Sequence, residues 1–306
     1  MNRRILRLLC AVLLGVAACS PEQTRTIGLS MHFMRDDYAV KLVDTVRHVL
    51  EREAEFRLIV TDANAAPQKQ LADIENLVVQ NVAAIIVVPI DEKAILPAIE
   101  KANARNIPVV AITKIPDAEV LTTVGATSDY ANGRASGELL AEATSGKGKL
   151  AMIGIQYSLW RIDQREQGFF DAIRDTDLEV VARQSGLDQA RVQDTVAGIL
   201  VAHPDLAGIW CTFSNQIVGA ADALRAAGRR DIVLTGIDAD KAIIERIREG
   251  WITGTAAQFP VQQGRLAVQA VLDHFQGNPV ATSYEVPTGL VRKDNVDEMN
   301  RMIWGE

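Results

Sequence analysis

The sequence predicts an α/β fold of two doubly wound parallel-sheet lobes. Short apolar runs typical of buried strands alternate with segments of helical periodicity along almost the whole chain. Alternation of this kind indicates βαβ units and parallel strand pairing. The chain contains about ten such runs, which is too many for one ordinary sheet. Its 306 residues also exceed the usual length of a single domain, so two lobes are expected.

The first lobe is predicted to begin with strands and helices in strict alternation. One of its strands, AAIIVVP, is apolar throughout, as expected of a parallel strand that helices cover on both faces. Its first helix has apolar residues at helical spacing, which are Val40, Val43, Val46, Val49 and Leu50. Strands are expected at 25–31, 56–62, 83–89 and 107–113, and helices at 38–54, 67–80 and 92–105.

The same rhythm restarts with a helix at 130–144, where the chain is expected to cross into the second lobe. Strands are then predicted at 149–155, 178–184, 206–212 and 232–238, and helices at 163–174, 189–202, 215–227 and 241–248. A final helix is expected at 261–275. The run YEVPTGLV at 284–291 predicts a last strand that Pro287 interrupts.

Residues 1–18 have the pattern of an export signal peptide. Three arginines precede an apolar run at 8–14 and then small residues, and this run is too short for a transmembrane helix. The segment VAAC at 16–19 resembles the lipobox of bacterial lipoproteins, in which the cysteine is lipidated and becomes the first mature residue. We therefore expect a lipid anchor on Cys19, with an ordinary cleavage site as the alternative.

The charge pattern argues against a nucleic-acid-binding protein. The formal net charge is −7, and lysines and arginines are interspersed with acids instead of forming a basic patch. Proteins that bind DNA concentrate positive charge to displace the counterions of the phosphates. We expect no nucleic-acid partner and, apart from the lipid anchor, no contact with the membrane.

Polar side chains follow nearly every predicted strand, at the point where the strand ends. Carboxyl ends of parallel strands share one edge of a sheet, and ligands bind at that edge in open α/β folds. Two lobes that face each other through these edges would enclose a binding cleft. The residues concerned are His32, Asp36, Asp62, Thr113, Lys114, 157–163, 212–215, Asp238 and Gln258.

Signatures of catalysis and of cofactor or metal binding were sought, and none was found. The sequence has no Gly-x-Ser-x-Gly elbow, and no Gly-x-Gly-x-x-Gly follows a strand. The segment SGKGKL at 145–150 lacks the spacing of a phosphate loop and lies between a helix and a strand, so it is interpreted as a turn. The four histidines form no metal-ligand spacing. We expect no enzyme activity, no cofactor and no metal.

A series of phrases in the sequence resembles the ribose-type periplasmic sugar-binding proteins of bacterial ABC importers. In order, these are IGLSMHFMRDDYAVKLVDTV, NIPVVAITK, TSDYANGRASGE, DQREQGFFDAI, AHPDLAGIW, LTGID and AAQFPVQQG. The resemblance implies the type I periplasmic binding protein fold, in which a three-segment hinge joins two lobes that close on the ligand. The implied crossings lie near 128–129, 258–259 and 287–288. The implied division is a signal peptide at 1–18, a tether at 19–25, lobe 1 at 26–128 plus 259–287, and lobe 2 at 129–258 plus 288–306.

The resemblance also implies ligand-binding residues. Asp36 and Tyr38 match a loop that carries an amide and aromatics in the family, and Asp238 matches the ligand-binding aspartate after TGI. Gln258 matches the hinge glutamine, while Phe213 and Asn215 lie in a loop that supplies an amide. The candidate ligand-binding set is His32, Asp36, Tyr38, Thr113, Lys114, Trp160, Asp163, Phe213, Asn215, Asp238 and Gln258.

Three departures from the ribose pattern, which involve four of these positions, leave the ligand open. Thr113-Lys114 stands where the family has Asp-Arg, Asp163 stands where it has an arginine, and His32 aligns with a serine.

Several candidate positions also have an alternative interpretation. Asp238 either contacts the ligand or caps the following helix, a role that we assign to Asp240 instead. Arg165 is expected in an internal ion pair, with a sugar contact as its alternative. Trp160 either stacks on the ligand or lines the rim of the cleft.

The function implied is capture of a sugar or polyol and its delivery to an ABC transporter permease by a monomeric lipoprotein. The same scaffold could instead report its ligand to a membrane receptor or histidine kinase. The protein is expected in the periplasm or at the cell surface, anchored through Cys19. Because the predicted cleft is rich in acids and has Lys114 as its clear cation, a neutral polyhydroxy ligand is favoured over an anionic one.

Overall fold

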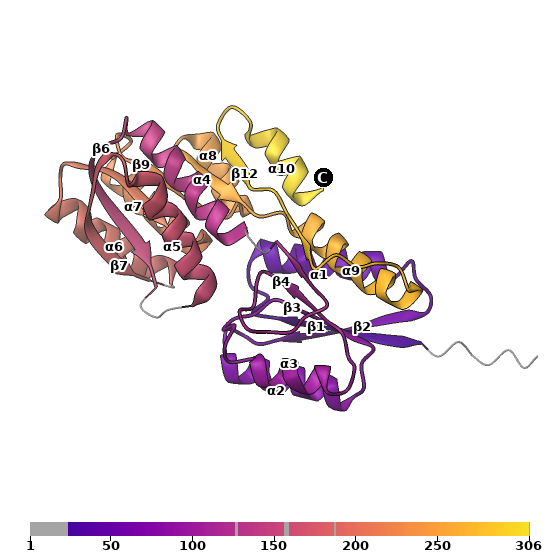
Figure 1. The fold of residues 1–306 in the computed structure, drawn as a ribbon. Helices are drawn as coiled ribbons and strands as arrows, with labels where there is room; N and C mark the ends of the chain where they lie inside the picture. The colour runs from indigo at the N-terminus through magenta and orange to yellow at the C-terminus, as the bar shows by residue number, and fades with distance from the viewer. Residues whose placement is uncertain (1–23, 126–127, 156–158, 187, 306) are drawn as a thin grey trace, which may run out of the picture.

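The computed structural model describes residues 24–125, 128–155, 159–186 and 188–305. Within these ranges the chain forms two α/β lobes, each built on a six-stranded sheet with helices on both faces (Figure 1). The predicted fold class is therefore confirmed. The predicted signal peptide, the predicted lipidation site Cys19 and Tyr157 lie outside the described residues.

Lobe 1 is built on the sheet with strand order β11-β5-β4-β3-β1-β2. All its strand pairs are parallel. Its strands are β1 (Arg25–Met31), β2 (Phe56–Asp62), β3 (Ala84–Val87), β4 (Val109–Ile112), β5 (Thr122–Val124) and β11 (Ser283–Tyr284). Its helices are α1 (Asp37–Leu50), α2 (Pro67–Val79), α3 (Leu96–Asn103) and α9 (Pro260–Gln276).

Lobe 2 repeats this arrangement with strand order β12-β10-β9-β8-β6-β7. Its strands are β6 (Lys147–Gly154), β7 (Asp177–Ser185), β8 (Leu206–Cys211), β9 (Val233–Ile237), β10 (Gly254–Ala257) and β12 (Gly289–Arg292). Its helices are α4 (Ser128–Ala143), α5 (Trp160–Ile173), α6 (Gln189–Ala202), α7 (Ser214–Ala227), α8 (Lys241–Glu249) and α10 (Val296–Trp304). The edge strand β12 differs from its counterpart β11 because it pairs with β10 in antiparallel orientation.

The chain passes between the lobes three times in the part that the structure describes. It leaves lobe 1 between β5 and α4, returns between β10 and α9, and crosses again between β11 and β12. Figure 1 shows the second and third of these passages at the junction of the two lobes, close to the C-terminal helix α10. All three passages begin after the carboxyl end of a strand or the helix start that follows it, namely after β5, β10 and β11.

Each lobe has a buried core on its sheet. Strands β3 and β4 are buried at every residue, which explains their continuous apolar sequence. In lobe 2 the buried Trp210 stacks on Phe169 at a ring-centroid distance of 4.4 Å, and its indole N–H donates to Ser136 Oγ at 2.9 Å. The polar atom of this large core residue is thereby satisfied.

The structure differs from the predicted elements mainly at the hinge. The run at 284–291 is not one strand, because β11 belongs to lobe 1 and β12 to lobe 2. Strands β5 and β10 and helix α10 were not predicted, since the strands are short and contain mainly threonine, glycine and alanine. None of the described helices combines the length and apolar character needed to cross a membrane.

Candidate functional site

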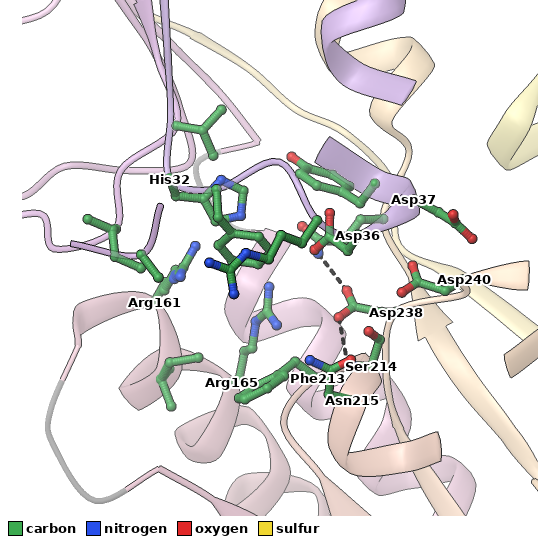
Figure 2. A pocket seen from close by; sticks show the side chains of 18 of the residues that line it. His32, Asp36, Asp37, Arg161, Arg165, Phe213, Ser214, Asn215, Asp238 and Asp240 are labelled. Carbon is green, nitrogen blue, oxygen red and sulfur yellow. Dashed lines mark hydrogen bonds between the residues drawn. The ribbon is translucent and has the colours of Figure 1, made fainter. Parts of the chain in front are cut away.

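A cavity of about 500 Å³ lies between the two lobes. Loops that follow β1 and β4 line it from lobe 1, and loops that follow β6, β8 and β9 line it from lobe 2 (Figure 2). This volume is in the range of small-molecule sites, and the carboxyl ends of parallel strands are the expected place for such a site.

Thr113 and Asp238 hold equivalent positions in the two lobes. Thr113 directly follows β4 and Asp238 directly follows β9, and each of these is the fourth strand of its lobe in chain order. Both have a positive φ, +69° for Thr113 and +97° for Asp238. Their backbone N–H groups donate to Val124 and Ala256 in the neighbouring strand, at 2.9 and 2.8 Å. Residues other than glycine adopt this region rarely and at some cost in energy, so each side chain is held in a direction that a regular strand end would not give it.

The carboxylate of Asp238 is held by two donors. Its Oδ2 accepts from the backbone N–H of Ser214 at 3.0 Å, and its Oδ1 accepts from Gln258 Nε2 at 2.7 Å. Asp238 therefore caps the N-terminus of α7 and not that of its own following helix, and the favourable helix dipole stabilises its charge there. Asp240 stands at the N-cap of α8, but its side chain makes no capping hydrogen bond.

On the lobe 1 side, the loop before α1 supplies His32 and Asp36. His32 is 4% exposed and its Nδ1 has no partner among the described residues. Burial, together with Arg161 and Arg165 nearby, lowers its pKa well below the ordinary value, so the ring is neutral at pH 7. Asp36 caps α1 through a 2.7 Å bond from the backbone N–H of Ala39. Burial and the charge of Asp238 raise the pKa of Asp36 to about 6.

Arg165 of α5 belongs to a bonded network at the back of the cavity. It is 6% exposed, its Nε donates to Asp129 Oδ1 at 2.8 Å, and its Nη1 donates to the carbonyl of Thr212 at 3.0 Å. Asp129 also accepts from Thr113 Oγ1 at 2.6 Å, which links the two lobes. The predicted internal ion pair of Arg165 is thus present, and its side chain also lines the cavity.

A close contact between helices α4 and α5 makes this network possible. A Cβ atom at Gly133 would lie 1.9 Å from the carbonyl oxygen of Arg165, and one at Gly168 would lie 2.2 Å from that of Tyr130. Only glycine allows the two backbones to approach this closely. The approach brings Asp129 at the start of α4 beside Arg165.

Arg161 lies one helical turn before Arg165 and faces the same cavity (Figure 2). Residues four apart on a helix share one face, which accounts for the pairing. The Nε of Arg161 is buried and has no partner among the described residues. It can therefore donate to a bound ligand.

Apolar and aromatic side chains cover the remaining walls of the cavity. Phe33 and Phe213 lie on opposite lobes, and aliphatic residues fill the space between them; these are Val88, Ile90, Ile112, Ile155, Leu159 and Ile162. Aromatic faces of this kind pack against the C–H groups of a ring.

Most predicted site residues line the cavity, namely His32, Asp36, Tyr38, Thr113, Phe213, Asn215, Asp238 and Gln258. Lys114, Trp160 and Asp163 are not among its described lining residues. Lys114 is exposed, because Thr113 turns the chain at its positive φ and directs its own hydroxyl to Asp129. Asp163 is exposed two residues before Arg165, a spacing that places the two on nearly opposite sides of α5. The ligand-binding roles of all these residues stay predictions.

The expectation that Lys114 is the clear cation of the cleft needs correction. The described cations that line the cavity are Arg35, Arg161 and Arg165. Arg161 falls in the range 157–163 that was expected at the cleft, but the candidate ligand-binding set omitted it, although its spacing from Arg165 gave a signal. The set also missed Asp129 and Gln263, which no sequence signal indicated because they reach the cavity only through helix packing. No group of three or more His, Cys, Asp or Glu side chains in the described ranges fits a metal ion.

Comparisons with known proteins agree with this geometry. The family model described as "Periplasmic binding protein domain" matches residues 27–279. The ribose import binding protein of Bacillus subtilis is 29% identical over 269 residues, which cover 87% of this chain and 86% of that protein.

Solved structures of solute-binding proteins have the same fold. One from Bacillus halodurans with bound myo-inositol has a TM-score of 0.84 at 24% identity, covering 92% of this chain and 99% of its own. Another from Actinobacillus succinogenes with bound D-allose has a TM-score of 0.82 at 24% identity, covering 90% and 99%.

Proposed function

Because the chain belongs to the periplasmic binding protein family, we propose that it captures a sugar or polyol between its lobes and delivers it to an ABC importer. It is a solute-binding protein and not an enzyme. The relatives to which it is similar are also solute-binding proteins. One of these is named for ribose import, and two hold D-allose and myo-inositol, which supports the ligand class. Residence in the periplasm or at the cell surface, with an anchor at Cys19, belongs to the same proposal.

The observation that carries this proposal is a cavity with polar groups from both lobes and aromatic walls. A sugar has hydroxyl groups around its edge and apolar C–H groups on its faces. Asp36 and Asp238 offer carboxylate acceptors, and Arg161 Nε offers a donor without a protein partner. Hydrogen bonds to charged groups are worth about 1.5–3 kcal/mol each. Phe33 and Phe213 would cover the ring faces.

Contacts between the lobes support a closing motion. Asp37 of α1 accepts a 2.9 Å hydrogen bond from the backbone N–H of Lys241 at the start of α8, in the other lobe. The Thr113–Asp129 bond lies at the hinge. A ligand that bridges the lobes would favour an arrangement in which these contacts form, and an importer would distinguish that arrangement from an open one.

A thermal-shift screen against monosaccharides and polyols tests the proposal. Bound ligand stabilises the folded protein by mass action, so a micromolar binder raises the melting temperature. If no member of either class raises the melting temperature while another chemical class does, the proposal fails. Where the screen does find a sugar or polyol, a second assay separates delivery from the sensor alternative. It measures whether the ligand-bound protein stimulates ATP hydrolysis by a reconstituted importer.

Asp238→Ala is expected to weaken binding of the ligand found in the screen by tenfold or more, since it removes a charged acceptor worth at least about 1.4 kcal/mol. Titration calorimetry measures the affinity. Asp238→Gly serves as a second variant, because glycine adopts the φ of +97° without strain and keeps the fold intact. Unchanged affinity in both variants would remove Asp238 from the site.

A further inference from the structure

Four aspartates from both lobes line one end of the cavity. Asp36 and Asp37 come from lobe 1, and Asp238 and Asp240 from lobe 2 (Figure 2). Among the described residues, none of the four makes an ion pair, although other acids of the chain do. Asp36, Asp37 and Asp238 accept hydrogen bonds from backbone N–H groups or an amide. Like charges gathered in this way repel each other.

The arginines of the cavity offset this cluster only in part. Arg161 lowers the pKa of Asp36, but burial and Asp238 leave that pKa raised, and Asp238 raises the pKa of Arg165. Arg165 is paired with Asp129. The charge of Arg161 also acts on the buried Glu92, whose pKa it lowers against the larger effect of burial, which raises it. Arg35 hydrogen-bonds Asn64. Each of these arginines thus acts on another polar group as well, and the four carboxyl groups are left without an ion-pair partner of their own.

A second, independent feature indicates what else the ligand carries. His32 lines the same cavity, is 4% exposed and has an Nδ1 without a partner in the described ranges. The buried Nε of Arg161 also lacks a partner. A neutral imidazole and a guanidinium N–H, both buried, are satisfied by hydroxyl groups.

The four carboxyl groups do not fit a bare metal ion. No three His, Cys, Asp or Glu side chains in the described part of the chain come together as a metal site. An ammonium group has three N–H donors and is carried by a larger molecule, so it can donate to several carboxylates at once while the rest of that molecule fills the cavity.

We propose that the ligand is a polyhydroxy ring compound with one ammonium group, such as an amino sugar or an aminocyclitol, whose ammonium lies against Asp36, Asp238 and Asp240. This inference rests on the proposed function. It narrows the class of ligand from sugars and polyols in general to those that carry an amine. The hydroxyl groups face His32 and Arg161, and the aromatic side chains cover the ring.

Matched ligand pairs test this inference. Each pair shares one ring and differs only at one carbon, which bears an ammonium group, a hydroxyl group or an acetamido group. Glucosamine, glucose and N-acetylglucosamine form one set, and an inosamine and the corresponding inositol form another. In at least one set, the amine is expected to bind about tenfold more tightly than the hydroxyl compound at pH 7 and low salt, because charged hydrogen bonds are stronger than neutral ones.

Proton release provides a second readout. Burial and the neighbouring Asp238 raise the pKa of Asp240 to about 8, so this carboxyl is largely protonated at pH 7. An ammonium beside it would lower that pKa and release the proton, whereas a neutral polyol would not. Calorimetry in two buffers of different ionisation enthalpy measures the release.

Asp240→Asn is the variant that isolates the effect. It should abolish most of the preference, so that the amine and the hydroxyl compound bind this variant within about twofold of each other, because the amide keeps hydrogen-bonding capacity but not charge. Asp175→Asn, an exposed aspartate of the same lobe, is the control and should change nothing.

The outcomes are separable. If hydroxyl compounds bind at least as tightly as their amines in every set, the inference is overturned and the proposed function stands. If no set binds but an α-amino acid does, both are overturned, because Arg161 would then hold a carboxylate.

Discussion

Thr113 and Asp238 stand at equivalent points of the two lobes, yet they present different chemistry to the cavity. The sheets share one strand order, and each residue follows the fourth strand with a positive φ. Thr113 donates to Asp129 across the hinge, whereas Asp238 accepts from Ser214 and Gln258 within lobe 2 and at the hinge. The shared fold determines where a side chain stands, and the residue type determines what it can bind.

The helix pairs that flank the cavity extend this comparison. Helix α9 packs on α1 in lobe 1 as α4 packs on α5 in lobe 2. Tyr38 OH donates to Gln263 Oε1 at 2.8 Å across the first pair, and Arg165 Nε donates to Asp129 Oδ1 at 2.8 Å across the second. All four side chains line the cavity. Lobe 1 therefore joins its helices with a neutral hydrogen bond, and lobe 2 with a buried ion pair.

The largest predicted effect comes from breaking the ion pair. Asp129→Asn should lower the free energy of unfolding of the ligand-free protein by about 3–5 kcal/mol, because it leaves the buried charge of Arg165 without its partner. The amide keeps the shape of the carboxylate, so the loss reports on charge. Urea denaturation followed by circular dichroism measures it.

A double variant provides the control for this prediction. Asp129→Asn combined with Arg165→Met removes both charges and should recover much of the stability, since a buried pair often contributes little against apolar residues of similar volume. If the single variant is as stable as the wild type, the pair does not hold α4 and α5 together.

The next largest effect is expected from glycine-to-alanine variants, which test how closely the helices pack in the α4–α5 and α1–α9 pairs. Gly133→Ala should cost about 3 kcal/mol, because the new Cβ would lie 1.9 Å from the backbone carbonyl of Arg165. Gly264→Ala, in the equivalent place of the α1–α9 pair, should change stability by less than about 1 kcal/mol. Its Cβ would meet the Thr45 side chain at 3.1 Å, and alanine gains about 1 kcal/mol of helix propensity.

Gly198→Ala completes that series as a control. Nothing lies within 4 Å of a Cβ at Gly198 in α6, so the variant should gain up to about 1 kcal/mol from helix propensity alone. Equal losses in Gly133→Ala and Gly264→Ala would contradict the difference in packing between the lobes. All three variants are compared by the midpoint of thermal unfolding.

The fold could be predicted because its signals are local. Apolar runs such as AIIV in β3 and helical periodicity as in α1 depend only on neighbouring residues. Strand β10, with the sequence GTAA, carries no such signal, and its small residues are explained by close neighbours: a Cβ at Gly254 would lie 2.5 Å from the carbonyl of Val291. The division of 284–291 between two sheets depends on the whole topology.

The cavity residues also divide into those that local sequence signals predict and those that depend on the tertiary structure. Those that follow strands, such as His32 and Asp238, could be predicted because parallel strands end at one edge. Asp129 could not, because it reaches the cavity only where glycines let α4 and α5 approach. The outward position of Lys114 depends on the backbone of Thr113, which no residue pattern in the sequence indicates.

The smallest predicted effect concerns the neutral bond of lobe 1. Tyr38→Phe should cost about 1 kcal/mol in the ligand-free protein, because it leaves the buried Gln263 Oε1 without its donor. Tyr130→Phe is the matched control in lobe 2. Its hydroxyl donates to Asp171 at 3.0 Å in a half-buried position where Gln167 and Arg174 also serve that carboxylate, so a smaller loss is expected. A loss from Tyr38→Phe as large as that from Asp129→Asn would mean that the two lobes join their helices with equal strength, whatever the charge of the groups.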